Sequence, residues 1–358
     1  MVLNHSPLLC IATFLVSIWI SCNAHKHGSY MRNADDGFNH RKNWMSSISD
    51  DVPLSEMAIP GTHHSSTFTW DTDVTMTQVL NFQQQLNFGV RFFDIRIRHA
   101  NNAFALHRGH LFLGLYFSDQ FLNTVDNFLK NNPSETVLIL LKKEYSPESN
   151  TRSMRDTLQR YLNQYADTFL QTNYRNVTLG RARGKFIIFS DYDQFNSFGL
   201  QYWECDIQDN YHLSTNWDLY NKWEGVKNQL ENARNGNASS FYINYLSGRG
   251  GSFPYFVASG HSSSGTSAPR LATGLTTPGW SSSYPDFPRV GCFIGICTIA
   301  FEGTNTLTYD KLQEYNEYPS GNRRTVGIIV ADFPGDSLIA AIIDNNSSIK
   351  KRLTNNSA

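Results

Sequence analysis

Two stretches constrain the fold most, Ala58-Ile-Pro-Gly-Thr-His-His-Ser-Ser-Thr67 and Val90-Arg-Phe-Phe-Asp-Ile-Arg-Ile-Arg98. They are followed by Leu106-His-Arg-Gly109. In the second piece, apolar residues alternate with Asp94, Arg96 and Arg98. Because successive side chains of a strand point to opposite faces, these three charged residues share one face. A carboxylate and a guanidinium on one face form either an exposed ion pair or a preorganised anion site.

The same region supplies histidines, a carboxylate and arginines at the ends of, or alternating along, apolar runs. Cleavage of a phosphodiester needs a base that takes a proton, an acid that protonates the leaving oxygen, and a fixed cation beside the phosphate. From the strand alone the exposed ion pair is favoured, because such pairs are common on protein surfaces, and it is the combination of motifs described next that shifts the balance to the anion site.

The combined motifs resemble the catalytic half of the bacterial-type phosphatidylinositol-specific phospholipases C. The segment Asn132-Pro-Ser-Glu-Thr-Val-Leu-Ile-Leu-Leu-Lys-Lys-Glu-Tyr145 shares the resemblance, which extends from about Trp44 to Phe333. It is weaker between Gly248 and Thr325. The resemblance implies an α/β fold, an irregular (β/α)8 TIM-type barrel with a single catalytic domain.

The hydrophobic pattern independently favours that barrel. Continuous apolar runs, each followed by polar residues, alternate with helical stretches, as in parallel sheets that are buried on both faces. Active sites of such barrels lie at the carboxyl ends of the strands, where His63, Lys142, Asp191 and Asp332 would gather. The expected strands are Leu54–Ile59, Val90–Arg98, Ala103–His107, Thr136–Leu141, Lys185–Phe189, Phe241–Tyr245 and Val326–Ala331. The expected helices are Trp44–Asp51, Met76–Phe88 with Gly89 as its stop, one that Ser118 caps and Asn132 ends, Ser153–Leu170, Thr215–Ala233 and Tyr309–Tyr318.

The resemblance also implies catalytic roles. His63 matches the general base that takes the proton from the inositol 2-hydroxyl, and Asp332 matches the carboxylate that orients it. Arg96 matches the cation on the phosphate, with Asp94 beside it. The hydroxyl then attacks phosphorus, expels diacylglycerol and leaves a cyclic inositol phosphate. We assign the general acid to His107.

Three positions depart from the family pattern. His64 stands where the family usually has an aspartate. Arg108 separates His107 from Gly109, where the family has histidine directly before glycine, so strict register would place Arg108 in the site and make His110 a possible substitute. Asp191 replaces an arginine near the inositol, which disfavours phosphorylated inositols.

The remaining matched positions concern the headgroup and the cofactor. Lys142, Asp209 and Tyr211 fall where the family contacts inositol hydroxyls, Glu144 follows the shared Lys-Lys-Glu, and Asp191 completes the predicted substrate-binding set. Calcium-dependent relatives carry a carboxylate at the Arg96 position. We therefore expect no metal cofactor and a calcium-independent enzyme.

The organisation of the chain indicates export. The apolar run from Pro7 to Ile20 and the small residues up to Ala24 predict a signal peptide over 1–24, followed by a flexible leader over 25–43 and the catalytic domain over 44–358. An uncleaved signal anchor is the alternative. We expect a secreted monomer that meets its phospholipid substrate at a membrane surface, and the net charge of -1 argues against nucleic acid.

Cysteines and sequons fit an extracellular chain. Of the cysteines after the signal segment, we expect Cys292 and Cys297 to pair and Cys205 to stay free. Glycosylation sequons begin at Asn176, Asn237, Asn345, Asn346 and Asn355.

The segment 248–304 is rich in Gly, Ser and Pro. We expect a long loop, either a stapled surface loop or a lid or membrane-touching rim, with Trp70 and the aromatics of Phe253–Phe256 as candidates for membrane contact.

Two other functions remain open. A secreted binding module could keep the barrel without the acid histidine. A metal-dependent barrel phosphodiesterase would need clustered Glu and Asp on the early strands, and this sequence lacks them.

Overall fold

The computed structural model describes residues 28–31, 34, 37–70, 72–261, 271–277, 280, 282–317, 324–347 and 349. The predicted signal peptide and the first residues of the predicted leader lie outside this range. No helix among the described residues is long and apolar enough to cross a bilayer.

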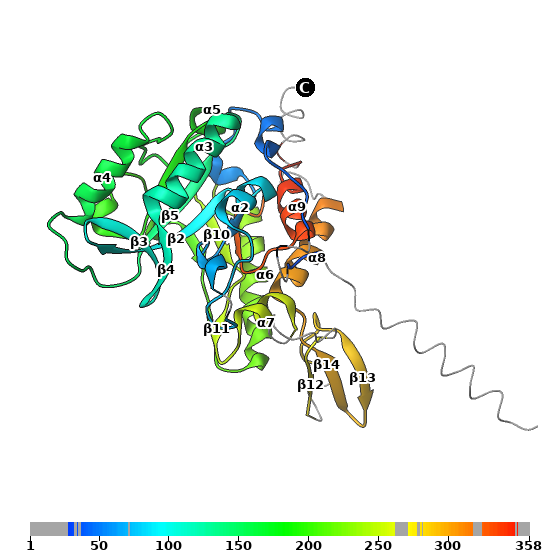
Figure 1. Cartoon of the computed structure of the whole chain (residues 1–358). Coiled ribbons are helices and arrows are strands. Elements are labelled where there is room, and N and C mark those ends of the chain that lie inside the picture. Colours follow the sequence, from blue (N-terminus) through cyan, green and yellow to red (C-terminus); the bar gives the residue numbers. More distant parts are fainter. Residues whose placement is uncertain are drawn as a thin grey trace, which may run out of the picture.

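Eight parallel strands curl into an open barrel (Figure 1). Their order is β7-β6-β5-β2-β1-β15-β10-β8, and the outermost strands, β7 and β8, do not pair with each other in the described chain. The predicted α/β barrel is therefore confirmed, with a seam between two strands that follow one another in sequence. The strands are β1 (Ile59–Thr62), β2 (Phe92–Ala100), β5 (Val137–Lys143), β6 (Phe186–Ser190), β7 (Leu200–Gln201), β8 (Asp206–Gln208), β10 (Tyr242–Tyr245) and β15 (Ile328–Ala331).

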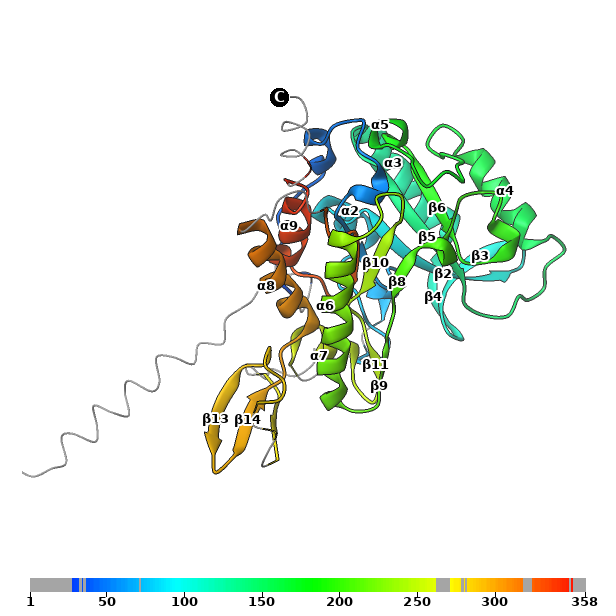
Figure 2. The same ribbon diagram turned by 180° about the vertical axis from the view of Figure 1, so that it is seen from behind.

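Helices cover the outside of this sheet. Figure 2 shows α6 lying along β10 and β8, with α8 and α9 beyond it. The helices are α2 (Phe82–Phe88), α3 (Asn123–Asn131), α4 (Met154–Gln164), α5 (Leu179–Ala182), α6 (Leu219–Asn235), α7 (Pro254–Ser259), α8 (Thr304–Glu317) and α9 (Asp336–Asp344).

Alternation along each strand determines which side chains enter the barrel. In β5, Leu138 and Leu140 belong to the inner core, whereas Ile139 and Leu141 pack outward. In β2, Phe92 points inward and Ile95 packs outward. Residues of the same parity, farther along each strand, therefore line the barrel mouth, as the alternating pattern predicted.

The predicted first strand was displaced. Leu54–Glu56 is a short 3-10 helix, and β1 includes the Pro60-Gly61 pair that was expected to end the strand. The Pro60 carbonyl still accepts from the amide of Arg91 at 2.9 Å. A Cβ on Gly61 would lie 3.0 Å from Phe92, so glycine permits the close approach of the two strands.

Several helix boundaries also differ from the predictions. Helix α2 begins only after Asn81, whose side chain accepts from the Gln84 amide in a capping box. Gly89 ends it with φ of 118°, as predicted. Ser118 does not cap α3, because it lies in the π-helical turn Phe117–Leu122. Helices α4 and α8 are respectively shorter and longer than predicted, and Trp44–Ser47 is a 3-10 turn.

A two-stranded extension follows β2. Strand β3 (Ala103–Arg108) pairs antiparallel with β2, and the unpredicted β4 (Leu111–Tyr116) pairs with β3. The turn between β3 and β4 consists of Gly109 and His110. Both residues belong to the region considered above for the general acid.

The segment predicted as a long loop contains regular structure. Helix α7 is followed by a three-stranded sheet of β12 (Thr273–Leu275), β13 (Arg289–Phe293) and β14 (Ile296–Ala300), which projects from the barrel (Figure 1). The predicted Cys292–Cys297 disulfide joins β13 to β14, and Cys205 is free.

Candidate active site

His63 and Asp332 form the centre of the site. Strands β1 and β15 are parallel neighbours in which Thr62 pairs with Ala331, so the next residue of each strand leaves the sheet beside the other. The Nδ1 of His63 lies 2.7 Å from Oδ1 of Asp332, whose side chain is 1% exposed. This contact leaves Nε2 of His63 as the nitrogen available to a substrate.

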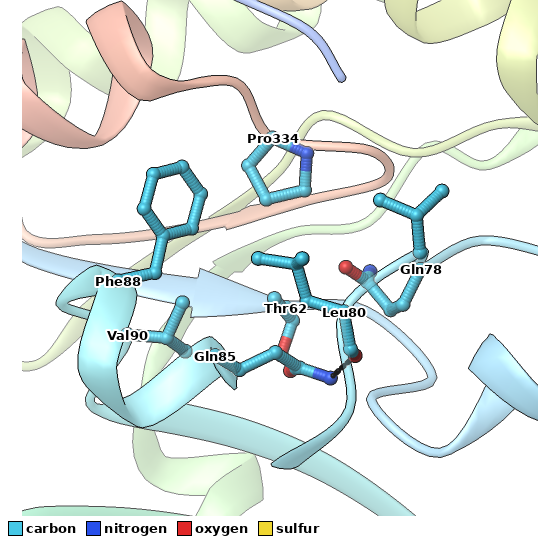
Figure 3. A pocket seen from close by; sticks show the side chains of 8 residues that line it. Thr62, Gln78, Leu80, Gln85, Phe88, Val90 and Pro334 are labelled. Atoms are coloured by element: carbon cyan, nitrogen blue, oxygen red, sulfur yellow. Dashed lines mark hydrogen bonds between the residues drawn. The ribbon is translucent and has the colours of Figure 1, made fainter. Parts of the chain in front are cut away.

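The turn after β1 is fixed by residues that were predicted to be helical. Thr77 Oγ1 and Gln78 Nε2 donate to the carbonyl of His63, at 3.1 and 2.9 Å. Gln78, Thr62 and Gln85 also border a small pocket behind β1 (Figure 3), which holds none of the predicted catalytic groups. The non-helical backbone between residues 76 and 81 thus supports the histidine, a role that helical spacing could not reveal.

Asp94 and Arg96 form a buried pair rather than an exposed one. Nε and Nη2 of Arg96 donate to the two oxygens of Asp94 at 2.9 and 3.0 Å, and Asp94 is fully buried. Burial alone would raise the pKa of Asp94, but the adjacent Arg96 guanidinium lowers it to about 2. The pair therefore presents a rigid guanidinium at the barrel mouth, which suits an anion.

Glu144 links this pair to the β3–β4 extension. One carboxylate oxygen accepts from Nη1 of Arg96 at 3.2 Å, and the other accepts from the Gly109 amide at 2.7 Å. The predicted substrate-binding Glu144 thus positions Arg96 in this structure.

Lys142 and Asp191 form one wall of the mouth. Their charged groups lie 3.1 Å apart, and Nζ of Lys142 lies 4.3 Å from the centroid of the Tyr202 ring. The Tyr202 hydroxyl donates to that of Tyr245 at 3.2 Å, and the Tyr245 ring stands edge-on to the His63 ring at 5.9 Å. The two tyrosines were not predicted, because each resembles an ordinary core residue in sequence.

Asp209 and Tyr211 lie farther out, on the segment between β8 and β9 (His212–Leu213). Both are exposed, and the guanidinium of Arg249 lies 5.3 Å from the Tyr211 ring centroid. Arg249 belongs to the short strand β11 (Arg249–Gly250), which pairs with β9. The rim therefore carries an arginine that the sequence did not single out.

His107 and Arg108 point to different surroundings. His107 is buried, its ring is parallel to that of Tyr145 with centroids 6.4 Å apart, and its Nδ1 has no hydrogen-bond partner among the described residues. Burial lowers the pKa of His107. Arg108 interacts electrostatically with Asp332, and its Nη2 donates to the Val74 carbonyl at 3.0 Å. His110 is exposed in the turn.

His64 lies directly against His63. The rings of His63 and His64 meet edge to face, with centroids 4.6 Å apart, and His64 has a φ of 41°. A positive φ is uncommon outside glycine and often marks a functional turn. Burial, followed by the positive charges of Arg96, His63 and Arg108, lowers the pKa of His64 well below its ordinary value.

No group of three or more His, Cys, Asp or Glu residues within the described ranges converges on a possible metal position. Fixed positive charge at the site is carried by Arg96, Arg108 and Lys142, of which Lys142 is paired with Asp191.

Comparisons with known proteins identify the family of this chain. The family model "Phosphatidylinositol-specific phospholipase C, X domain" matches residues 51–192. A 1-phosphatidylinositol phosphodiesterase of Staphylococcus aureus is 30% identical over 273 residues, covering 66% of this chain and 80% of the relative. The chain belongs to the phosphatidylinositol-specific phospholipase C family.

Two further similarities extend the comparison. A 1-phosphatidylinositol phosphodiesterase of Listeria monocytogenes is 33% identical over 190 residues, covering 48% of this chain and 58% of the relative. The solved structure of a phosphatidylinositol-specific phospholipase C from Listeria monocytogenes superposes with a TM-score of 0.62 at 24% identity, covering 86% of this chain and 99% of that structure. This structure supports the fold.

Proposed function

We propose that this protein is a metal-independent phospholipase C that cleaves phosphatidylinositol, or the inositol lipid of a glycosylphosphatidylinositol anchor. The observation that carries the proposal is the contact of His63 with Asp332 at the same barrel mouth as the buried Asp94–Arg96 pair. A base and a phosphate-binding cation are the two groups that an attack on phosphorus needs first.

The proposed reaction proceeds in one displacement. Nε2 of His63 takes the proton of the inositol 2-hydroxyl, and that oxygen forms a bond to phosphorus while the bond from phosphorus to the glycerol oxygen breaks. The leaving oxygen takes a proton from a general acid. The products are diacylglycerol and a cyclic inositol phosphate. Asp332 stabilises the charged imidazole, and Arg96 stabilises the charge on the phosphate oxygens.

For the general acid, the sequence favours His107, and the structure supports a second candidate. His107 stacks on Tyr145 and interacts electrostatically with Arg98 and Glu144, whereas His64 contacts the ring of His63 and interacts electrostatically with Arg96. A bound phosphate adds negative charge beside His64, which opposes the lowering of its pKa by the arginines. Each histidine therefore has a specific argument for the role.

The headgroup that we propose carries no additional phosphate. Asp191 neutralises Lys142 on the wall of the mouth, so a phosphorylated inositol would meet a carboxylate rather than a free cation there. Uncharged hydroxyls can accept from Lys142 and donate to Asp191.

We also propose that the protein is secreted and monomeric. The Cys292–Cys297 disulfide is typical of oxidising compartments, and the apolar run before Ala24 suits a signal peptide. Asn176 and Asn237 are exposed and accessible to glycosylation, whereas Asn345 and Asn346 are buried. Asn355 lies outside the described residues.

The test measures release of water-soluble inositol phosphate from phosphatidylinositol vesicles in excess chelator. We expect activity in the wild type and its loss in His63→Ala. An inactive wild type, with or without calcium, would contradict the proposal and favour a binding module of the same fold.

The acid is identified by changing the leaving group. His107→Ala, His64→Ala and His110→Ala are compared on phosphatidylinositol and on an inositol phosphodiester of p-nitrophenol, which leaves without a proton. Loss of the acid should lower turnover of the lipid by about 10²- to 10⁴-fold and spare the nitrophenyl substrate. A variant that loses both activities has lost positioning or folding instead.

A further inference from the structure

The hairpin of β13 and β14 ends in an exposed apolar tip. Phe293 is 77% exposed, Ile294 is 79% exposed and Val290 is 66% exposed, and Ile296 is also exposed. On the adjacent strand β12, Leu275 is 66% exposed. Single exposed apolar residues are normal on a soluble protein, but a contiguous group of them marks an interaction surface.

The tip carries no charge. The sequence from Val290 to Ile296 reads Val-Gly-Cys-Phe-Ile-Gly-Ile, without an acidic, basic or amide side chain. Edges and tips of exposed sheets are usually protected by charged residues, particularly lysine. A protein partner normally meets a polar rim around an apolar centre, and this tip is apolar throughout.

The turn sequence cannot be explained by folding alone. Ile294 has a φ of 47° and Gly295 a φ of 76°, so both central residues of this two-residue turn are left-handed. Such turns prefer Asn-Gly or Asp-Gly, and a β-branched residue with positive φ is an outlier. Isoleucine is thus placed where it is unfavourable for the backbone and fully available to a partner.

The disulfide makes the tip a rigid unit. Cys292 and Cys297 are directly paired residues of β13 and β14, one pair before Phe293 and Ile296. The tip has little core of its own, so the covalent link replaces packing as the element that keeps Phe293 and Ile294 together.

The hairpin lies at the catalytic end of the barrel. Figures 1 and 2 show it projecting beyond α7, at the end where β9 and β11 lie and where β10 finishes. His63 and Asp332 follow the carboxyl ends of their strands at this same end. Phe253 and Tyr211, also exposed, belong to segments that follow β10 and β8.

We propose that the β13–β14 hairpin is a membrane anchor, which inserts Phe293 and Ile294 into the boundary between headgroups and acyl chains of a phospholipid bilayer. The inference rests on the proposed function, because a lipid substrate brings a bilayer to the barrel mouth. A bilayer has an apolar interior behind a polar surface, and it fits a protruding tip that is apolar from Val290 to Ile296 and has the exposed Arg289 at its base. Of the residues considered for membrane contact, Tyr255 and Phe256 are buried and Trp70 is partly buried against the core, whereas Phe253 is exposed.

The first test is binding to phosphatidylcholine vesicles, measured by sedimentation of the full chain. These vesicles contain no substrate, so the measurement is independent of catalysis. Phe293→Ser and Ile294→Asn should each weaken partitioning by about tenfold or more, because each removes one large apolar group from the bilayer. Binding should persist at high salt, since the tip is uncharged.

Two controls distinguish loss of the membrane contact from a general effect of the substitution. Tyr174→Ser removes a side chain that is 67% exposed and precedes α5 in the chain, a helix that Figure 1 shows at the other end of the molecule from the hairpin, and it should leave vesicle binding unchanged. Ile294→Asn suits the left-handed backbone, so its thermal midpoint should equal or exceed that of the wild type while its binding falls. A loss of binding therefore cannot be attributed to unfolding.

The activity measurement links the anchor to the site. Both tip variants should lose turnover of phosphatidylinositol in vesicles and keep turnover of a short-chain phosphatidylinositol below its micelle concentration. Vesicle binding that is equal in wild type and tip variants would overturn the proposal, as would light scattering that shows a wild-type dimer and monomeric tip variants. If the wild type cleaves neither substrate, the proposed function fails, while loss of binding in the tip variants would still support the anchor.

Discussion

Arg96→Met separates the two roles of Arg96, which holds a buried carboxylate and, in our proposal, binds the phosphate. The guanidinium donates to both oxygens of Asp94, which is fully buried. It holds the pKa of Asp94 at about 2, against an ordinary value of 3.8. At 1.36 kcal/mol per unit, this depression corresponds to about 2 kcal/mol.

The lowered pKa of Asp94 fixes how the stability of the fold depends on pH. A lowered pKa contributes stability above the unfolded value near pH 4, and the contribution is lost as the pH falls through the folded value near 2. Without Arg96, burial raises the pKa of Asp94, and an unpaired carboxylate costs stability at neutral pH. We therefore expect Arg96→Met to lower the free energy of unfolding by about 3–5 kcal/mol at pH 7.

The companion variant is Arg96→Met with Asp94→Asn, which removes both charges. Its stability in urea at pH 7 should return to within about 1.5 kcal/mol of the wild type, because the fully buried carboxylate is removed together with its cation, and Glu144 keeps the hydrogen bond from the Gly109 amide. Its phosphatidylinositol cleavage should remain at least about 10³-fold below the wild type, because nothing replaces the cation on the phosphate. Cleavage within tenfold of the wild type would refute the assignment of Arg96 to the phosphate, and an Arg96→Met protein as stable as the wild type would refute the electrostatic argument.

Three other predictions follow from single contacts. Asp332→Asn should lower kcat on short-chain phosphatidylinositol by about 10²- to 10⁴-fold with KM within about threefold, because the base loses its orienting charge; an unchanged kcat would remove Asp332 from the mechanism. Asp191→Asn should free Lys142 and raise the activity on phosphatidylinositol 4-phosphate relative to phosphatidylinositol, which competition between the two lipids would measure; an unchanged ratio would show that the headgroup does not meet this wall. Arg91→Met should destabilise the fold by about 3–5 kcal/mol in urea, because it leaves the fully buried Glu135 unpaired; a loss below about 1 kcal/mol would show that Glu135 is neutralised without Arg91.

The strands were predictable because the sheet is buried on both faces. In the run from Val137 to Leu141, alternate side chains pack into the barrel and against the helices outside it, so every position is apolar. Their carboxyl ends then place His63, Lys142 and Asp332 together by topology alone. The misplacement of β1 has a local cause, since Pro60 and Gly61 resemble a strand end until the pairing with β2 and β15 is known.

The details of the site depended on contacts between distant segments. Gln78 supports His63 from a stretch whose spacing resembled a helix, and Glu144 joins Arg96 to Gly109 across the extension of β3 and β4. Neither contact has a signal in local sequence. The exposed hairpin was hidden for a different reason, because its composition resembled that of an irregular loop and only the pairing of β13 with β14 shows which side chains protrude.

The seam between β7 and β8 makes one side of the barrel compliant. Widening it would break none of the pairings between the strands of the sheet, since the two strands do not pair with each other. Tyr202, which lies between them and contacts Lys142 through its ring, would move with any such widening. The position of the Lys142 side of the mouth is therefore coupled to the part of the sheet with the fewest backbone pairings, whereas the pairing of β1 with β15, which holds His63 beside Asp332, lies on the opposite part of the sheet.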